Sequence, residues 1–537
     1  YPSNVDCEPA SPIGRIRHLF FKVHTPDMSL TLMVLLSFSG VSTAASGRDD
    51  INLSLNQVIE TLNPFNVSSI VCTQLYCQIY DVLFFQNDAG ELEPRLAESF
   101  ELAEDNVTYT VHLRDGVKFH NGKKLTAEDA AWSIDYALKS GPYKMIRPKV
   151  PGYKSVKVID DLTFQIVSDG PNPTLLNNIS IWVNILCKEE VLAAGEKFGI
   201  EWIPCGAGPY VISSYNPDTE IELKAFEDYY QGPASIKKVN YKILTDNNTI
   251  TVAFESGELD LIVVPTAAWT RFKSNSDYNT YLSPTNHTSF FHINSIRGDV
   301  LSDKRVRQAF SYAMDREMMV IAAYDGIAQT AYSLFNPSSV FGGFTVEEME
   351  KAGIPSYQYD PEKAKTLLAE AGYPNGFDAG KILCISGSYW EKMSTVFQAN
   401  LADIGVKVDI EVADSASCRA RRYDQDYDIS NTGTNFTPEA TYGYIYFKYL
   451  SDEARKAGER TELGLKDREL DDVYRKVLTE MNREKRKAAY LDLNRLLQDR
   501  MYTIPTFHKA IPYAYSKNLV CDEINTNYYY IYKFHWK

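Results

Sequence analysis

The sequence predicts a mixed α/β fold with open sheets that is divided into two or more lobes. Its 537 residues, 44% of them hydrophobic, exceed the roughly 250–300 residues at which a single core stops growing. Strand-like and helix-like patterns alternate from end to end, which favours open sheets covered by helices. No low-complexity linker or short repeat follows residue 48. The lobes are therefore joined by short crossings, and we expect a ligand cleft between them.

Two segments have the period-two pattern of a strand with one buried face. Apolar residues at 107, 109, 111 and 113 alternate with polar ones, and the same alternation recurs over 406–412. The turn Arg114-Asp115-Gly116 closes the first strand.

Helix signals are clearest in four segments. A helix is predicted over 125–138, with Thr126 as its cap and Asp129 completing a capping box. Another begins at Asp360-Pro361 and ends before Gly372. A third starts near residue 303, and a charged helical region covers about 467–500.

Composition and motifs exclude several classes of function. The net charge of −15 disfavours nucleic acid as a partner, because polyphosphate binders need basic surface. The glycine-rich GAGP at 206–209 lacks the Lys-Ser/Thr of a phosphate loop. No GxSxG or HExxH motif and no zinc-ligand spacing is present, so the sequence predicts no enzyme, metal site or cofactor.

The first 47 residues resemble a leader. The apolar run at 28–41 is shorter than the roughly 18–20 residues of a membrane span, and Ser42-Thr43-Ala44 resembles a cleavage site. We therefore expect export to the periplasmic space or the outer face of the cytoplasmic membrane. Because disulfides persist in such compartments, three pairs are candidates, with isolated thiols as the alternative: Cys72 with Cys77, Cys187 with Cys205, and Cys384 with Cys418.

Eight blocks, in order along the chain, carry a resemblance to a known family. They are TLNPFN at 61–66, QIYDVL at 78–83, GELEPRLAESF at 90–100, YTVHLRDGVKFHNGK at 109–123, LTAED at 125–129, GAGPY at 206–210, DKRVRQAFSYAMDRE at 303–317 and AGYP at 371–374. In these blocks the chain resembles the family 5 extracellular solute-binding proteins of ABC transporters, the oligopeptide- and dipeptide-binding class.

The resemblance implies a two-lobed fold like that of type II periplasmic binding proteins. Lobe 1 would span 48–290 and be completed by 508–537, and lobe 2 would span 291–507. The chain would cross between lobes near 291–294 and 506–508, which allows hinge closure around a ligand. The implied partners are a small molecule or peptide and the membrane permease subunits of an ABC transporter. The protein itself is expected to be monomeric.

The resemblance also points to the second lobe as the anchor for a peptide's amino terminus. Peptide-binding members hold the ammonium with an acidic residue in a Trp-x-x-Asp-like segment, which corresponds here to 431–439. Asn435 stands at the acidic position, and an amide supplies no compensating charge. Glu439 or Asp428 would have to replace that acid. Phe436 lies in the same segment.

Three further groups are candidate ligand contacts by matched position, and each has a structural alternative. Ser69, Ile70 and Val71 correspond to main chain beside the ligand in the family. Tyr389 and Trp390 could stack on a ligand or pack in the core, and Phe291 and His292 could face the cavity or be structural.

The leading hypothesis is a receptor that captures an oligopeptide and delivers it to a permease. Within the binding class, the alternative ligand is a metal chelate, a sugar or an opine-like compound, which the Asn435 departure favours. The rival class is an exported hydrolase, because carboxylate dyads are invisible to sequence inspection.

Overall fold

The computed structural model describes residues 47–66, 69–87, 90–143, 146–337, 339, 341–435, 449–451, 461–521, 524 and 529–537. The predicted leader falls almost entirely outside these residues. Across the described ranges, no helix combines the length and apolar character that a bilayer crossing requires.

The largest sheet has eleven strands in the order β15-β14-β16-β12-β17-β11-β1-β10-β9-β8, with β13 paired to β17. β1 pairs in parallel with β10, and β14 does so with both β15 and β16, whereas β12 is antiparallel to β16 and β17. The mixed sheet predicted from the sequence is confirmed. Its strands are β1 Asp50–Leu55, β8 Tyr210–Asn216, β9 Glu220–Ala225, β10 Lys238–Ile243, β11 Leu261–Val263, β12 Tyr278–Ile293, β13 Gln329–Thr330, β14 Phe377–Ile385, β15 Val406–Ala413, β16 Ile429–Asn435 and β17 Thr503–Ser516.

A second, antiparallel sheet of four strands has the order β4-β5-β7-β6. Two short strand pairs, β2–β3 and β18–β19, complete the described β-structure. The bounds are β2 Phe84–Gln86, β3 Leu92–Pro94, β4 Ala97–Leu102, β5 Thr108–Leu113, β6 Tyr153–Val158, β7 Thr163–Ser168, β18 Leu519–Val520 and β19 His535–Trp536.

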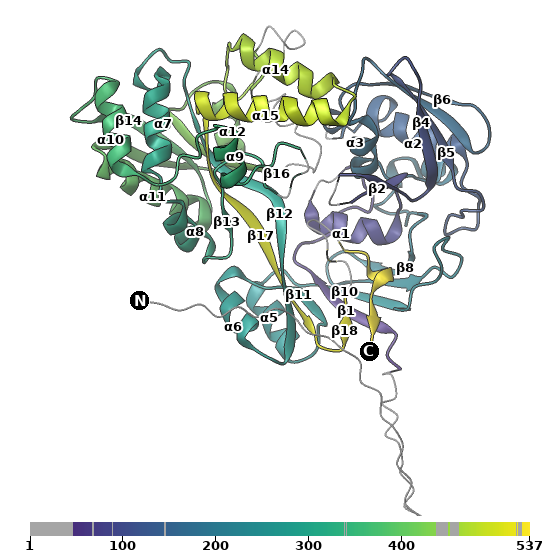
Figure 1. Cartoon of the computed structure of the whole chain (residues 1–537). Helices are drawn as coiled ribbons and strands as arrows, with labels where there is room; N and C mark the ends of the chain where they lie inside the picture. Colours follow the sequence, from purple (N-terminus) through teal and green to yellow (C-terminus); the bar gives the residue numbers. More distant parts are fainter. Residues whose placement is uncertain are drawn as a thin grey trace, which may run out of the picture. The chain divides into compact units, whose positions relative to one another are not determined.

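The helices are distributed along the whole chain between these strands (Figure 1). Their bounds are α1 Ile70–Ile79, α2 Ala127–Asp135, α3 Leu175–Trp182, α4 Lys188–Ala194, α5 Asn247–Glu255, α6 Trp269–Ser274, α7 Lys304–Ala313, α8 Arg316–Tyr324, α9 Val346–Lys351, α10 Pro361–Glu370, α11 Ser388–Asp403, α12 Ser415–Tyr423, α14 Arg468–Thr479 and α15 Arg483–Arg500.

The elements predicted from local patterns are confirmed. The strand at 107–113 is β5, which buries alternate residues, and that at 406–412 is β15. The helices predicted from 303, from Asp360 and over 467–500 are α7, α10 and the pair α14–α15. In α10, Asp360 accepts from the Lys363 amide, and Pro361 stands in the first turn.

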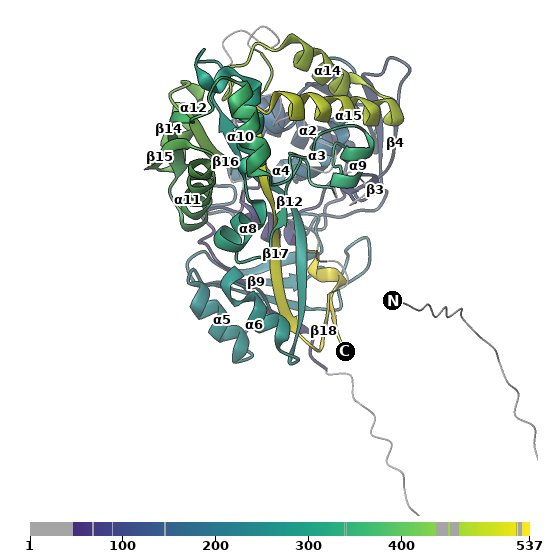
Figure 2. The ribbon, with the colours of Figure 1, turned by 60° about the vertical axis from the view of Figure 1, so that its left-hand side comes forward.

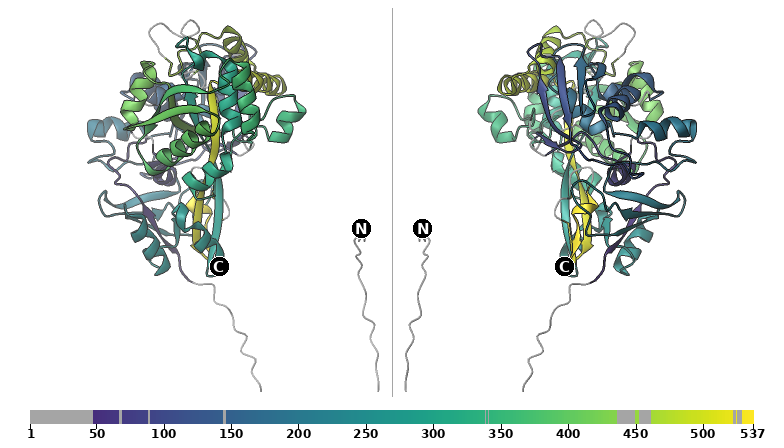
Figure 3. Two further views of the ribbon diagram at one scale, coloured as in Figure 1. Left: turned by 90° about the vertical axis from the view of Figure 1, so that its left-hand side faces the viewer. Right: turned by 90° about the vertical axis from the view of Figure 1, so that its right-hand side faces the viewer.

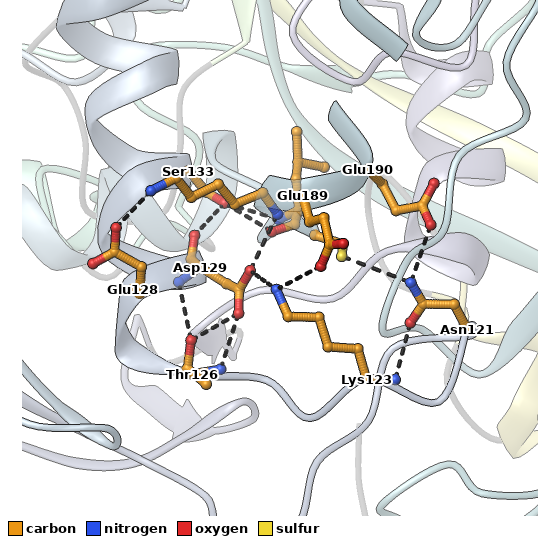
Figure 4. A network of polar contacts seen from close by, with 11 residues as sticks. Asn121, Lys123, Thr126, Glu128, Asp129, Ser133, Glu189 and Glu190 are labelled. Atoms are coloured by element: carbon orange, nitrogen blue, oxygen red, sulfur yellow. Dashed lines mark hydrogen bonds and ion pairs between the residues drawn. The ribbon is translucent and has the colours of Figure 1, made fainter. Parts of the chain in front are cut away.

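The helix predicted over 125–138 is α2, which continues into a π-helical turn at Tyr136–Ser140. Its capping box is present, because Thr126 and Asp129 exchange side-chain and backbone hydrogen bonds (Figure 4). The buried Asp129 carboxylate also accepts from Lys123 Nζ and from the Lys188 amide, each at 3.1 Å. One cap therefore also fixes the start of α4 against α2.

The buried apolar residues form separate clusters. The largest cluster takes its buried members from 51–261 and 513–534. Two others take theirs from 291–507 and from 290–497. The last segment of the chain therefore contributes buried residues to the same core as the first segment.

β12 and β17 are long strands that lie side by side in both Figure 1 and Figure 2. Their pairing extends from Tyr278–Ser516 to His292–Thr503. Figure 3 shows the same two strands, in teal and yellow, from two further sides. The pairing is interrupted between Pro284 and Thr288, which pair with Ala510 and His508. Three residues of β12 thus lie opposite Lys509 alone, and this irregularity is where side chains of the candidate site converge.

None of the six cysteines named as disulfide candidates is bonded in the structure, which describes each as a free thiol. Cys72 and Cys77 are both on α1, five residues apart, and so point to different sides of the helix. The sulfur atoms of Cys187 and Cys205 both accept from Asn121. Cys187 Sγ lies 3.9 Å from Asn121 Nδ2, and Cys205 Sγ lies 3.2 Å from the Asn121 backbone nitrogen. Cys384 and Cys418 belong to or border one small apolar cluster.

The glycine-rich segment at 206–209 serves close backbone packing against the end of α1. The Gly208 amide donates to the Ile79 carbonyl at 2.9 Å. A Cβ at Gly208 would lie 2.6 Å from the Ile79 carbonyl carbon, and one at Gly206 would overlap the same peptide group. Glycine is required here because two backbones touch.

We predict that Gly208→Ala lowers the free energy of unfolding by about 2 kcal/mol or more, because backbone on backbone leaves no flexible atom to move. Gly170→Ala is the matched control, since a Cβ there meets nothing within 4 Å. Urea unfolding of both variants measures the difference. Equal stabilities for the two would contradict the close packing.

Candidate functional site

The register of β12, β16 and β17 brings polar residues from distant parts of the chain to one side of the sheet. His287 pairs with Asn435 and Ser289 with Gly433 on this side, whereas Thr288, which pairs with His508, points to the opposite face. Directly paired residues point to the same face of a sheet. We call the resulting group the Lys509 cluster; it consists of His287, Tyr324, Tyr389, Trp390, Asn435 and Lys509.

Lys509 is the charged centre of this cluster. Its ammonium donates to Tyr389 Oη at 2.8 Å and lies 3.9 Å from the centroid of the Tyr389 ring. The Trp390 and Tyr324 rings are farther away, at 5.6 and 5.8 Å. Burial lowers the pKa of Lys509 to about 8. Lys509 is therefore mainly a cation at neutral pH, although its surroundings disfavour the charge.

The aromatic part of the cluster comes from two helices. Tyr389 and Trp390, in the first turn of α11, have ring centroids 4.2 Å apart. Tyr324, at the end of α8, meets Tyr389 edge-on at 6.3 Å and donates to the Ala510 carbonyl. These three side chains and Lys509 are partly buried. The rings thus form an apolar wall that still reaches the surface.

The opposite part of the cluster is neutral. His287 Nδ1 donates to Asn435 Oδ1 at 3.2 Å, because an amide oxygen only accepts. Burial and the positive charge of Lys509 lower the pKa of His287 well below its usual value. The His287 ring fits because its strand neighbour is Gly433, where a Cβ would lie 2.6 Å from Nε2. Asn435 itself is exposed.

No carboxylate of the described residues forms an ion pair with Lys509. The sequence had named Asp428 as a replacement acid for the ammonium anchor. Asp428 lies at the other end of β16, where it pairs with Arg297 and accepts from the Lys381 amide. Asp428 is therefore already engaged away from Asn435.

Three of the sequence-predicted site residues meet in this cluster: Tyr389, Trp390 and Asn435. Two others are core residues. Phe291 is fully buried against Phe397 at 4.5 Å, and His292 is fully buried with Nδ1 2.8 Å from Thr503 Oγ1.

The remaining predicted residues lie elsewhere. Ser69 caps α1 by accepting from the Cys72 amide and donates to Gln57. Val71 packs on the largest core, and only the backbone of Ile70, the first residue of α1, is described. Phe436 and Glu439 lie outside the described residues. Ser69 therefore has a structural role that accounts for it.

Sequence reasoning missed Lys509, His287 and Tyr324. Lys509 directly follows the crossing predicted at 506–508 and interrupts the apolar pattern of β17, which was a usable signal. His287 had no such signal, because its proximity to Asn435 depends on strand register.

Among the described residues, no group of three or more His, Cys, Asp or Glu side chains is placed to hold a metal ion.

The fold defines a structural class: a mixed α/β protein of the two-lobed, type II-like architecture. The structure resembles that of an ABC transporter substrate-binding protein, CtaP from Listeria monocytogenes, with a TM-score of 0.77 at 23% identity over 91% of this chain and 99% of that one. The likeness confirms the fold class predicted from the sequence.

Residues 91–456 match the family model described as bacterial extracellular solute-binding proteins, family 5 Middle. The chain belongs to this family, the solute-binding proteins of ABC importers. It is 27% identical to heme-binding protein A of Haemophilus influenzae, over 81% of this chain and 82% of that protein. It is also 28% identical to the glutathione-binding protein GsiB of Escherichia coli, over 70% of this chain and 73% of that protein.

We predict that Lys509→Met stabilises the unliganded protein. The folded-state pKa of Lys509 is about 8, below the value of 10.5 for an unburied lysine, so the folded state binds fewer protons between these values. Below pH 8, the free energy of unfolding of the wild type is therefore lowered by the full free-energy cost of burying the charged ammonium. This cost disappears as the pH rises from 8 toward 10.5, because Lys509 becomes neutral. The variant should be more stable by roughly 1–3 kcal/mol at pH 7.

Urea unfolding at pH 7 and pH 10 measures this effect, and the difference should shrink at the higher pH. Lys517→Met is the control, since Lys517 is exposed on the turn after β17. Destabilisation by Lys509→Met at pH 7 would show instead that Lys509 serves packing.

Proposed function

We propose that the chain captures a small peptide or peptide-like solute between two closing lobes and delivers it to an ABC permease without altering its covalent bonds. The single observation that carries this proposal is the Lys509 cluster. It is a partly buried group of aromatic and hydrogen-bonding side chains on the irregular part of β12 and β17. Such mixed apolar and polar surfaces are typical of small-ligand sites.

The separation of the cores supports two lobes with the boundaries expected from the sequence, 48–290 with 508–537, and 291–507. One set of clusters lies within 290–507, and the largest lies outside it. The interruption between Pro284 and Thr288 supports a bend slightly before the crossing expected at 291–294. A strand pair with a local irregularity can absorb the dihedral changes of hinge closure.

Apart from the contacts made by β12 and β17 themselves, the described residues include two exposed polar contacts between segments assigned to different lobes. Arg483, at the start of α15, pairs with Glu91 at 3.3 Å, and Met481 beside it packs on the largest core. Thr266 donates to Asp325 at 2.5 Å. Both pairs are exposed and therefore weak, so an opening motion could break them at little energetic expense.

The ligand class rests on two arguments. A relative is named as a glutathione-binding protein, and glutathione is a peptide, which supports a peptide-like ligand. The Asn435 position supports the alternative of a non-peptide solute. Among the described residues, the cluster has no acid to pair with an ammonium. A relative named as heme-binding fits that alternative.

The proposal includes export to the periplasmic space or the outer surface of the cell, and a monomeric state. A family of extracellular binding proteins supports the location. An exported hydrolase remains the rival class, and turnover of a peptide would identify it.

We predict that one or more di- to pentapeptides, glutathione included, raise the melting temperature of the purified protein. A ligand at 100 times its Kd stabilises the native state by about 2.7 kcal/mol. Differential scanning fluorimetry measures the shift, and mass spectrometry of the same samples should recover every peptide intact. Hemin and ferric EDTA are tested in the same way as non-peptide ligands.

If only hemin or ferric EDTA raised the melting temperature, the ligand would not be a peptide, but the proposal that the protein is a solute receptor would stand. Product release that is abolished by a single substitution in the cluster would overturn the receptor itself.

A further inference from the structure

We propose that Lys509 binds a carboxylate of the ligand, so that the solute is held at the end of β16 by its negative group. This inference rests on the proposed function, because it assigns a ligand chemistry to the same site. The family resemblance implied that the segment around Asn435 binds a positively charged ligand group, whereas this inference assigns a negatively charged one.

The first argument is the incomplete hydrogen bonding of Lys509. An ammonium has three N–H donors, and Tyr389 Oη is the only acceptor that it reaches among the described residues. Arg316 provides an internal comparison, because it is fully buried and also has no carboxylate partner among the described residues. It donates instead to the carbonyls of Ser311, Ala331, Tyr357 and Pro505. Arg316 is thus satisfied by the fold, whereas Lys509 retains donors.

The second argument is the charge of the surroundings. Neither His287 nor Asn435 carries a negative charge, and the positive charge of Lys509 itself opposes protonation of His287. A ligand ammonium at this place would meet a cation without compensation. A carboxylate would form a charge-assisted hydrogen bond, which is roughly twice as strong as a neutral one.

The third argument is the hydrogen-bonding polarity of Asn435. Its Oδ1 accepts from His287, which leaves the two N–H groups of Nδ2 at an exposed position. Among the described residues these groups have no acceptor. Lys509 and Asn435 therefore both present donors, and donors suit an anion.

The fourth argument concerns the rings of Tyr389 and Trp390. They cover one side of the ammonium and leave the cluster only partly exposed. Apolar cover lowers the local dielectric constant and strengthens the attraction between Lys509 and an opposite charge. The two adjacent, mutually tilted rings also offer an apolar surface to the part of the solute beside its carboxylate.

The test compares matched forms of the same peptides. Trialanine, tetraalanine and glutathione are titrated as free acids by isothermal titration calorimetry. For the two alanine peptides, the C-terminal amide and the N-acetyl form are included. With wild type, amidation should weaken binding roughly tenfold or more, because it removes a charge-assisted hydrogen bond. Acetylation should change the affinity much less.

Two variants and one control complete the design. Lys509→Met should remove the preference for the free acid and weaken its binding to the level of the amide. Asn435→Asp should weaken binding of the free acid, because it replaces a hydrogen-bond donor with a negative charge that repels the ligand carboxylate. An ammonium-binding site would respond in the opposite way. Lys517→Met should behave as wild type.

Each outcome decides the inference. If the free acid and the C-terminal amide bound wild type with equal affinity, Lys509 would not be a carboxylate site, although the protein would still be a peptide receptor. Tighter binding to Asn435→Asp would overturn the carboxylate site as well. Failure of every peptide to bind wild type would overturn peptide capture, and the carboxylate assignment would fall with it.

Discussion

The antiparallel pairing of β12 with β17 is the constraint on which the rest of the structure depends. These strands are more than 200 residues apart in sequence, and their register is fixed where apolar side chains such as Phe291 and Phe507 enter the same core. Because a slip of one residue would turn every side chain to the opposite face, that core specifies the register strongly. The same register brings Lys509 and His287 close together, so the geometry of the candidate site is determined by the packing of the adjacent core.

The interruption of this pairing has two consequences. Three residues of β12 face Lys509 alone, which leaves room for the His287 ring beside Gly433. The regular ladder hydrogen bonds are also lost here, in a strand pair that contributes residues to both sets of cores. A motion between the cores would therefore concentrate at the residues that form the cluster. Ligand contacts at such a point can shift an open–closed equilibrium by their full difference in free energy.

The parts of the fold that could be predicted from sequence are those set by local interactions. The capping box of α2, the Asp360-Pro361 start of α10 and the alternation in β5 and β15 each depend on residues a few positions apart. The cluster could be predicted only in part. Tyr389, Trp390 and Asn435 were named as candidate ligand contacts by matched position, but Lys509 and His287 join them through strand pairings that no local pattern encodes. From the sequence alone, Phe291 and His292 could not be distinguished from residues that line a cavity. Both are buried because each face of the sheet is covered at their positions.

Arg316 and Lys509 show how one fold treats two buried cations differently. The guanidinium of Arg316 is surrounded by backbone carbonyls from separate elements, which repays its desolvation and fixes α8 against β17. Lys509 receives no comparable set of acceptors among the described residues, so its burial opposes folding. A group that destabilises the empty protein and retains hydrogen-bond donors is stabilised when an anion arrives. If Lys509 binds an anion as proposed, the binding free energy includes the relief of this desolvation penalty, so the burial of Lys509 contributes to the affinity for a solute of opposite charge.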